Sequence, residues 1–217
     1  MKLLGIEASA VKALVFDMDG TLYENYDYYR FQESSQVQRL AGFLGIGSDE
    51  AAERLGAARS ARRAASLPPT SMANHFLSLG APMPSIISWR VEALIPGEWL
   101  RPDPRLDSVL AILSRRFRLV LLTNNPRSVG QASLEALGIA RHFETTVGLD
   151  DTEKSKPFPE PFLAACRSLG LPFGSCVSIG DRKDVDIEPA LALGMGGILV
   201  SGVSEVYELP AFFDISV

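Results

Sequence analysis

An apolar run passes directly into acidic residues at positions 11–21, which read Val11-Lys12-Ala13-Leu14-Val15-Phe16-Asp17-Met18-Asp19-Gly20-Thr21. The run has the length of a β-strand, but it lacks the alternation of apolar and polar residues that marks a strand with one solvated face. Near-continuous hydrophobicity of this kind is typical of a strand covered on both faces, as in a parallel sheet. Asp17 and Asp19 therefore fall where a buried strand is expected to end.

Further apolar runs of strand length follow later in the chain. They lie at residues 119–122, 176–179 and 197–200, with a weaker one at 145–147. Helix signals separate them, such as the Asp103-Pro104 pair, which is a favoured helix start, and the apolar residues that follow it at helical spacing. Strands that alternate with helices of this length indicate βαβ units. The predicted fold class is α/β, with a doubly wound, Rossmann-like parallel sheet as its core.

Residues 22–100 interrupt this alternation. They contain no convincing strand, and their apolar residues recur at helical spacing, as Ile87, Val91 and Leu94 do. Proline-rich turns separate the expected helices. An all-helical stretch of this length after the first strand indicates a second, smaller domain. We expect a Rossmann-like core of residues 1–21 and 101–217 and a helical domain of residues 22–100.

Composition and charge restrict the functional classes. The 217 residues are 47% hydrophobic and 22% charged, which is typical of a soluble globular chain. Lys and Arg number 21 against 26 Asp and Glu, so the net charge is −5 and binding to a nucleic-acid backbone is not expected. No apolar stretch is long enough to span a bilayer, and the one within Met1–Glu7 is too short for a signal peptide. We therefore expect a cytoplasmic protein with no nucleic-acid or membrane partner.

Polar residues follow three of the expected strands. The first strand ends in Asp17 and Asp19, the next in Thr123 and Asn124, and a later one in Asp181. In a doubly wound sheet the carboxyl ends of the strands meet at one edge, where ligands bind. Buried carboxylates without partners are costly, and carboxylates that converge are typical oxygen ligands of a divalent cation.

The residue types at this edge suit phosphoryl transfer. Two aspartates spaced by one residue, Asp17 and Asp19, can divide the work of nucleophile and proton donor. The Thr123 hydroxyl and Lys156 can hold an anion, and the proline that follows Lys156 stiffens the segment that directs the lysine. A metal, a lysine and a hydroxyl around one crevice are the groups that stabilise a transferring phosphoryl group.

Four motifs together resemble those of the haloacid dehalogenase-like hydrolase superfamily. They occur in the expected order, each at a predicted strand end or helix start, which makes the resemblance far more specific than any single motif. In chain order the motifs are Asp17-Met18-Asp19-Gly20-Thr21, Thr123-Asn124, Lys156-Pro157 and Gly180-Asp181-Arg182-Lys183-Asp184-Val185-Asp186. The resemblance covers the core from Val11 to Val200, whereas the helical insert matches in position and length but not in sequence.

The resemblance implies a role for each motif residue. Asp17 would attack phosphorus and form an aspartyl-phosphate. Asp19 would protonate the leaving oxygen and then take a proton from the water that cleaves the intermediate. Thr123 and Lys156 would hold the transferring phosphoryl group, with the amide of Asn124 nearby.

The same resemblance implies a Mg²⁺ ion. It would be bound by the carboxylates of Asp17 and Asp181 and by the backbone carbonyl of Asp19. Asp186 would support the metal from the fourth motif. Asp184 is the alternative for that role, because a shorter spacing also occurs in such enzymes, and we favour Asp186.

The function implied is a Mg²⁺-dependent phosphatase of small phosphorylated metabolites, similar to phosphoglycolate phosphatase or to a nucleotidase. Dehalogenase members lack the second aspartate of the first motif, so Asp19 favours phosphate chemistry. The helical insert looks like a cap that closes over the substrate and excludes water. Two alternatives stay open: a β-phosphoglucomutase-like phosphomutase on the same core, and a catalytically idle module that binds phosphate or metal.

Four tyrosines gather where the chain enters the insert. Tyr23, Tyr26, Tyr28 and Tyr29 lie just after the first motif, above the expected active site. Their rings could stack on a sugar or a nucleobase of the substrate, or they could pack the junction between the two domains. The sequence leaves both interpretations open.

Overall fold

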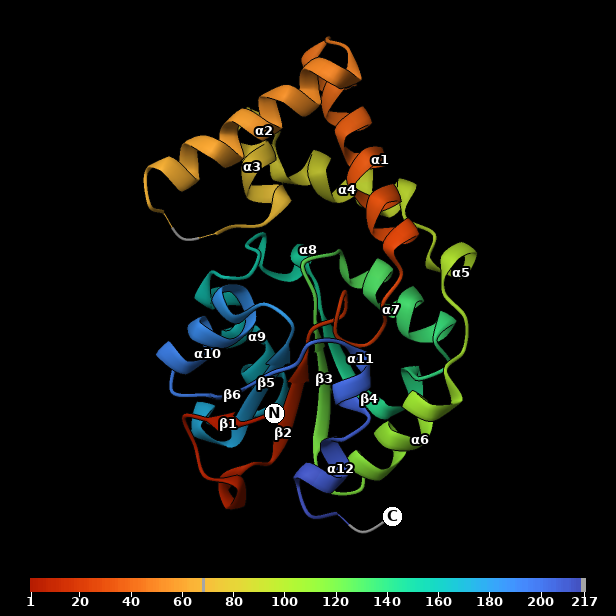
Figure 1. Ribbon diagram of the computed structural model, residues 1–217, viewed down its shortest axis with the longest axis vertical. Coiled ribbons are helices and arrows are strands. Elements are labelled where there is room, and N and C mark those ends of the chain that lie inside the picture. The colour runs from red at the N-terminus through yellow and green to blue at the C-terminus, as the bar shows by residue number, and fades with distance from the viewer. Residues whose placement is uncertain (68, 216–217) are drawn as a thin grey trace.

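The computed structural model describes residues 1–67 and 69–215 (Figure 1). Within these residues, six strands form one sheet in the order β1-β6-β5-β2-β3-β4. The strands are β1 (Leu3–Leu4), β2 (Ala13–Phe16), β3 (Arg118–Leu122), β4 (Phe143–Val147), β5 (Cys176–Gly180) and β6 (Gly196–Leu199). All neighbours pair in parallel except β1, which runs antiparallel to β6 at the edge. The predicted α/β class with a parallel, Rossmann-like sheet is confirmed.

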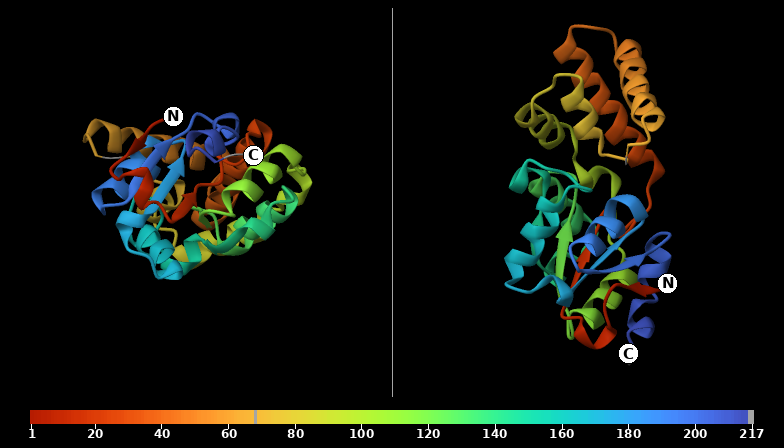
Figure 2. Two further views of the ribbon diagram at one scale, coloured as in Figure 1. Left: turned by 90° about the horizontal axis from the view of Figure 1, so that it is seen from below. Right: turned by 90° about the vertical axis from the view of Figure 1, so that its left-hand side faces the viewer.

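Helices cover both faces of this sheet (Figure 2). They are α6 (Pro104–Leu113), α7 (Arg127–Ala136), α8 (Leu149–Thr152), α9 (Pro159–Leu169), α10 (Glu188–Ala192), α11 (Val203–Val206) and α12 (Leu209–Phe212). Short 3-10 turns occur at Ala8–Ala10, Ala140–His142 and Phe173–Ser175, and a π-helical turn, η4, spans Lys183–Ile187. None of the helices within the described residues is both long and apolar enough to cross a bilayer.

Strand β2 shows why its apolar run is continuous. Leu14 and Phe16 pack into the core cluster that includes residues of α6, α11 and α12. Ala13 and Val15 face the other way, into the cluster formed with α9 and α10. Both sets are fully buried, so a polar residue at any of these positions would lose water without gaining a partner.

The register of the central strands aligns their carboxyl ends. Phe16 of β2 pairs with Leu121 of β3 on one side and with Ile179 of β5 on the other. The ladder then continues one step further, since the backbone N–H of Asp17 donates to the carbonyl of Ile179 at 2.8 Å. The polar residues that follow these strands therefore reach the same edge of the sheet.

The segment between β2 and β3 is helical, as expected. It contains α1 (Tyr26–Leu44), α2 (Ser48–Ala64), α3 (Met72–Ser78), α4 (Met83–Ala93) and α5 (Pro96–Trp99). Side chains cap two of these helices: Asn25 accepts from the N–H of Tyr28, and Ser71 accepts from the N–H of Asn74. Helices α1 to α4 lie beyond the carboxyl edge of the sheet (Figure 1) and share an apolar cluster that Leu149 of α8 joins. The division into domains at residues 22 and 100 remains a prediction.

The apolar face predicted for α4 is partly wrong. Leu94 is buried just after the helix, but Ile87 is only half-buried and Val91 is 47% exposed. The buried face of α4 instead carries Met83, Ile86 and Arg90. Because Arg90 interrupts the apolar pattern of the buried face, the apolar residues beside that face gave the clearer helical spacing. Strand β1 was not predicted either, because a two-residue edge strand has no readable period.

The ends of β3 and β4 meet at a glycine that tolerates no side chain. A Cβ at Gly148 would lie 2.1 Å from the backbone nitrogen of Arg127. We expect Gly148→Ala to lower the free energy of unfolding by about 2–4 kcal/mol, because the clash is with backbone and cannot be relieved by a rotamer. Gly56→Ala in α2 is the matched control: its Cβ would meet nothing within 4 Å, so a gain of about 0.5–1 kcal/mol is expected. Urea denaturation of the two variants checks both values, and an equally stable Gly148→Ala would contradict the close approach.

Candidate active site

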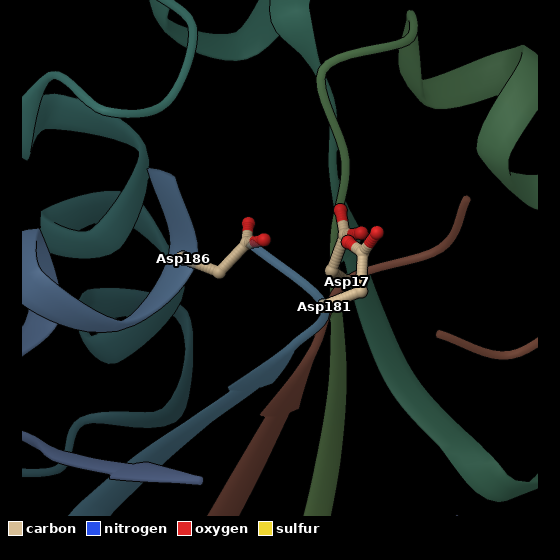
Figure 3. Close-up of side chains that lie close together, drawn as sticks. All are labelled: Asp17, Asp181 and Asp186. Carbon is tan, nitrogen blue, oxygen red and sulfur yellow. The ribbon is translucent and has the colours of Figure 1, made fainter. Parts of the chain in front are cut away.

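Three aspartates converge at the carboxyl edge of the sheet (Figure 3). Asp17 follows β2, Asp181 follows β5, and Asp186 projects from η4. One carboxylate oxygen from each lies within 4.8 Å of the others. Asp184, the alternative to Asp186, is half-buried and lies outside this cluster. The turn η4 therefore brings Asp186, and not Asp184, toward the end of β2.

Lys156 lies between two of these carboxylates. Its Nζ is 2.6 Å from Oδ1 of Asp17 and 2.6 Å from Oδ1 of Asp186, and its side chain is 1% exposed. Burial alone would lower the pKa of Lys156, but the charges of Asp17 and Asp186 outweigh it and raise that pKa above its usual value. The ammonium therefore stays charged, and it holds the Asp17 carboxylate in place.

Asn124 positions the lysine through the backbone. Its side-chain oxygen accepts from the N–H of Lys156 at 2.8 Å, and its side-chain nitrogen donates to the carbonyl of Lys156 at 3.2 Å. This two-way bond joins the loop after β3 to the segment before α9. Thr123 is buried beside it, where its hydroxyl oxygen accepts from the N–H of Asn125 at 3.1 Å. Contact of Thr123 and of the Asn124 amide with a phosphoryl group remains a prediction.

Asp19 is held by three donors. Oδ1 accepts from the Tyr23 hydroxyl and, at 2.8 Å, from the side-chain amide of Gln32. Oδ2 accepts from the side-chain amide of Asn125 at 3.2 Å. Burial raises the pKa of Asp19, although the hydrogen bonds from Tyr23 and Gln32 oppose the rise. A carboxyl group with a raised pKa can keep a proton near neutral pH and donate it to a leaving group.

Asp181 has one carboxylate oxygen that accepts no hydrogen bond, although the Nε of Arg182 lies 3.8 Å from it. Its Oδ1 is buried and makes no hydrogen bond to any residue that the structure describes. Burial, helped by the nearby charge of Asp17, raises the pKa of Asp181 to about 6. At Gly20, whose φ is +82°, a Cβ would lie 2.5 Å from Oδ2 of Asp181, so glycine at this turn leaves room for the carboxylate. A buried oxygen without a donor suits a cation ligand.

Three residues of this site were not predicted. Asn125 is 5% exposed and joins Asp19 to the insert: its amide nitrogen also donates to Gln32 at 3.3 Å. Its amide oxygen accepts from Nη1 of Arg90 at 2.6 Å. The position of Asn125 next to Thr123-Asn124 was a usable signal. For Gln32 and Arg90 no signal exists, because a polar residue on a helix is normally solvated.

The four tyrosines differ in their surroundings. Tyr29 accepts from the N–H of Gly20 at 2.8 Å and donates to the carbonyl of Tyr23 at 2.7 Å. Tyr28 is buried and stacks on Trp99 with ring centroids 5.6 Å apart, whereas Tyr26 is 71% exposed. Tyr23, Tyr28 and Tyr29 thus pack and form hydrogen bonds at the junction between β2 and α1.

A cavity of about 400 Å³ lies between the sheet edge and the insert. Asp19, Gly20 and Asp181 line it from the edge of the sheet. Gln32, Ser71 and Arg90 are among the residues that line it from the insert. Tyr29 is the one of the four tyrosines that reaches it. Asp19, Asp181 and the insert therefore face a common space, large enough for a small metabolite.

Comparisons with known proteins agree with this geometry. Residues 11–194 match the family model of the haloacid dehalogenase-like hydrolases. The N-acylneuraminate-9-phosphatase of Rattus norvegicus is 32% identical over 122 residues, which cover 49% of each chain. The phosphoglycolate phosphatase of Escherichia coli strain K12 is 31% identical over 110 residues, 51% of this chain and 42% of that one. The chain thus matches about half the length of these curated relatives or less.

Solved structures show the same fold. A crystal structure of a phosphatase of this family from Thermococcus onnurineus has a TM-score of 0.62 and covers 93% of this chain and 97% of its own. At 23% sequence identity this similarity concerns the fold alone.

Proposed function

We propose that this chain, which belongs to the haloacid dehalogenase-like hydrolase family, is a Mg²⁺-dependent phosphatase of small phosphate monoesters. Catalysis would proceed through an aspartyl-phosphate on Asp17. The observation that carries the proposal is the ion pair between Asp17 and the buried Lys156. Asp19, whose pKa is raised, lies two residues further along the chain. The phosphatase names of the two curated relatives support it.

The first step uses Asp17 as the nucleophile. Lys156 donates to one of its oxygens, and the Thr21 hydroxyl lies 3.4 Å from the other, so the carboxylate is held in a fixed orientation. A bond forms between a carboxylate oxygen and phosphorus, and the bond from phosphorus to the ester oxygen breaks. The Lys156 ammonium offsets the negative charge that gathers on the phosphoryl oxygens.

Asp19 moves the proton in both steps. Its Oδ1 already accepts two hydrogen bonds and Oδ2 accepts one, so we place the proton on Oδ2. Asp19 gives this proton to the leaving oxygen and becomes a carboxylate. In the second step it takes a proton from a water whose oxygen attacks phosphorus, which releases inorganic phosphate and restores Asp17.

The residues present fit a Mg²⁺ site. The carboxylates of Asp17 and Asp181 and the backbone carbonyl of Asp19 would hold the ion, and the buried Oδ1 of Asp181, which accepts no hydrogen bond, is the structural observation that favours it. Asp186 already binds Lys156 through Oδ1, and its Oδ2 accepts from the N–H of Arg182 at 3.1 Å, so it would support the site rather than ligate. When bound, Mg²⁺ offsets the charge of the transferring phosphoryl group.

Removal of the metal is expected to abolish turnover. Phosphate release would be measured on sugar, nucleotide and short-acid phosphates, with Mg²⁺ and with a chelator. We expect release only with Mg²⁺, return to background with the chelator, and recovery on adding excess Mg²⁺. The melting temperature with and without Mg²⁺ reports binding independently of turnover, since a ligand of the folded state raises it.

Two results would contradict the proposal. Release that persists in the chelator would exclude the metal requirement. A folded protein that binds Mg²⁺ but releases phosphate from none of the esters would exclude the phosphatase, and isomerisation of a sugar phosphate primed by a bisphosphate would then be assayed.

A further inference from the structure

Arg90 is a buried cation at the wall of the cavity. It lies on α4 and is 7% exposed. Its Nη1 donates to the side-chain oxygen of Asn125 at 2.6 Å and to the carbonyl of Asn124 at 3.3 Å. Its Nε is buried and has no partner among the described residues. Because both hydrogen bonds leave from Nη1, the edge formed by Nε and Nη2 is left for another group.

No carboxylate of the described residues forms an ion pair with Arg90. Two other arginines line the same cavity, and each has an acidic partner. Arg59 lies 2.6 Å from Glu33, and the Nε of Arg182 lies 3.8 Å from Asp181.

A buried guanidinium without an anion is costly, and this cost points to a missing partner. Burial lowers the pKa of Arg90 to about 10, although the charge of Asp19 opposes the fall, and Arg90 stays cationic at neutral pH. A bound anion would recover the lost solvation.

We propose that Arg90 binds a carboxylate of the substrate, so that the preferred substrates are phosphate monoesters of hydroxy acids. This inference rests on the proposed phosphatase function and names its substrate class. One positive charge without an ion-pair partner matches the single negative charge of a carboxylate, whereas a second phosphate would bring about 1.5–2 negative charges. The planar guanidinium edge formed by Nε and Nη2 can donate two parallel hydrogen bonds to a carboxylate.

The position of Arg90 also limits the size of the substrate. One amide, that of Asn125, separates Arg90 from Asp19, with contacts of 2.6 Å on one side and 3.2 Å on the other. The guanidinium is therefore within about 8 Å of the carboxyl group that protonates the ester oxygen. The carboxylate of the substrate is expected only a few bonds from its ester oxygen.

A matched pair of esters tests the inference. 3-Phosphoglycerate and glycerol 3-phosphate differ only in a carboxylate in place of a hydroxymethyl group. We expect kcat/KM for 3-phosphoglycerate to be about 10- to 100-fold higher, the effect of a charge-assisted hydrogen bond. Arg90→Met should reduce this ratio to about 1–3, and Arg90→Lys should keep part of it because a point charge lacks the planar fork.

Arg59→Met is the matched control. It removes an arginine from the same cavity, but Glu33 already balances that charge, so the ratio between the two esters should not change. If Arg59→Met lowers the ratio as much as Arg90→Met does, the discrimination comes from the general field of the cavity and the inference is wrong.

Binding without turnover separates this inference from the proposed function. In Asp17→Asn, calorimetric titration with each ester should show tighter binding of 3-phosphoglycerate, and Arg90→Met in that background should remove the difference.

Equal kcat/KM for the two esters in an active wild-type enzyme would overturn the role of Arg90 alone. No turnover of either ester or of p-nitrophenyl phosphate would overturn the phosphatase, while the titrations would still report on Arg90. If Arg90→Met does not fold, the kcat/KM ratio between the two esters is compared between Arg90→Lys and the wild type, and an unchanged ratio contradicts the inference.

Discussion

Replacement of Asp17 by asparagine is expected to lower phosphate release by about 10⁴-fold or more, because an amide oxygen cannot attack phosphorus as a carboxylate does. The substitution keeps the shape of the side chain. Lys156 keeps its contact with Asp186, so no buried cation is left without a partner. The folded state should therefore be retained. Single-turnover phosphate release at saturating Mg²⁺ measures the effect, and circular dichroism with the melting temperature checks the fold.

Asp184→Asn is the matched control for this experiment. It removes one carboxylate from η4 outside the converging cluster, and we expect release within about twofold of the wild type. If Asp17→Asn keeps activity within tenfold of the wild type, Asp17 is not the nucleophile. If Asp184→Asn loses activity while Asp186→Asn does not, the fourth motif works through Asp184 instead.

Replacement of Lys156 by methionine is expected to damage both stability and activity. The substitution leaves the carboxylates of Asp17 and Asp186 buried and facing each other, each without the ammonium that lies 2.6 Å away in the structure. Removing one partner of a buried ion pair costs about 3–5 kcal/mol of unfolding free energy. Loss of the charge that stabilises the phosphoryl group should lower kcat/KM by about 10³-fold. Urea denaturation and phosphate release measure the two effects separately.

A double variant tests the reason for the instability. Lys156→Met combined with Asp186→Asn removes one of the two carboxylates that had faced the ammonium, so we expect it to recover about 1–3 kcal/mol relative to Lys156→Met alone. Activity should not recover, because the ammonium is still missing. If Lys156→Met is as stable as the wild type, or if the double variant is the less stable of the two, the buried charges do not interact as the distances indicate.

The sequence alone was sufficient to predict the parallel sheet of the core and the convergence of Asp17 and Asp181 at its edge. An apolar run without alternation requires burial on both faces, and β2 shows it, since Leu14 and Ala13 pack on opposite sides of the sheet. Parallel strands in register carry the residues that follow them to one edge. Asp17 and Asp181 come together for this reason, and no information beyond strand order and connectivity is needed.

The motif spacing favoured Asp186 over Asp184 but did not exclude Asp184. The two residues are separated by one position, so a turn that directs one inward directs the other away. The structure forms a π-helical turn at residues 183–187, in which Asp186 is buried against Lys156 and Asp184 is not. The motif spacing favoured the same residue, but only the geometry of the turn places its carboxylate.

The contacts between the insert and the sheet edge were decided by the tertiary structure alone. Helical periodicity shows which residues share a face, but it does not show which face turns toward a distant part of the chain. Gln32 and Arg90 reach Asn125 across 93 and 35 residues of sequence. Their surroundings make them part of the site: on a solvated helix each would bind water, whereas here the buried Arg90 donates to Asn124 and Asn125, and the half-buried Gln32 bonds to Asp19 and Asn125.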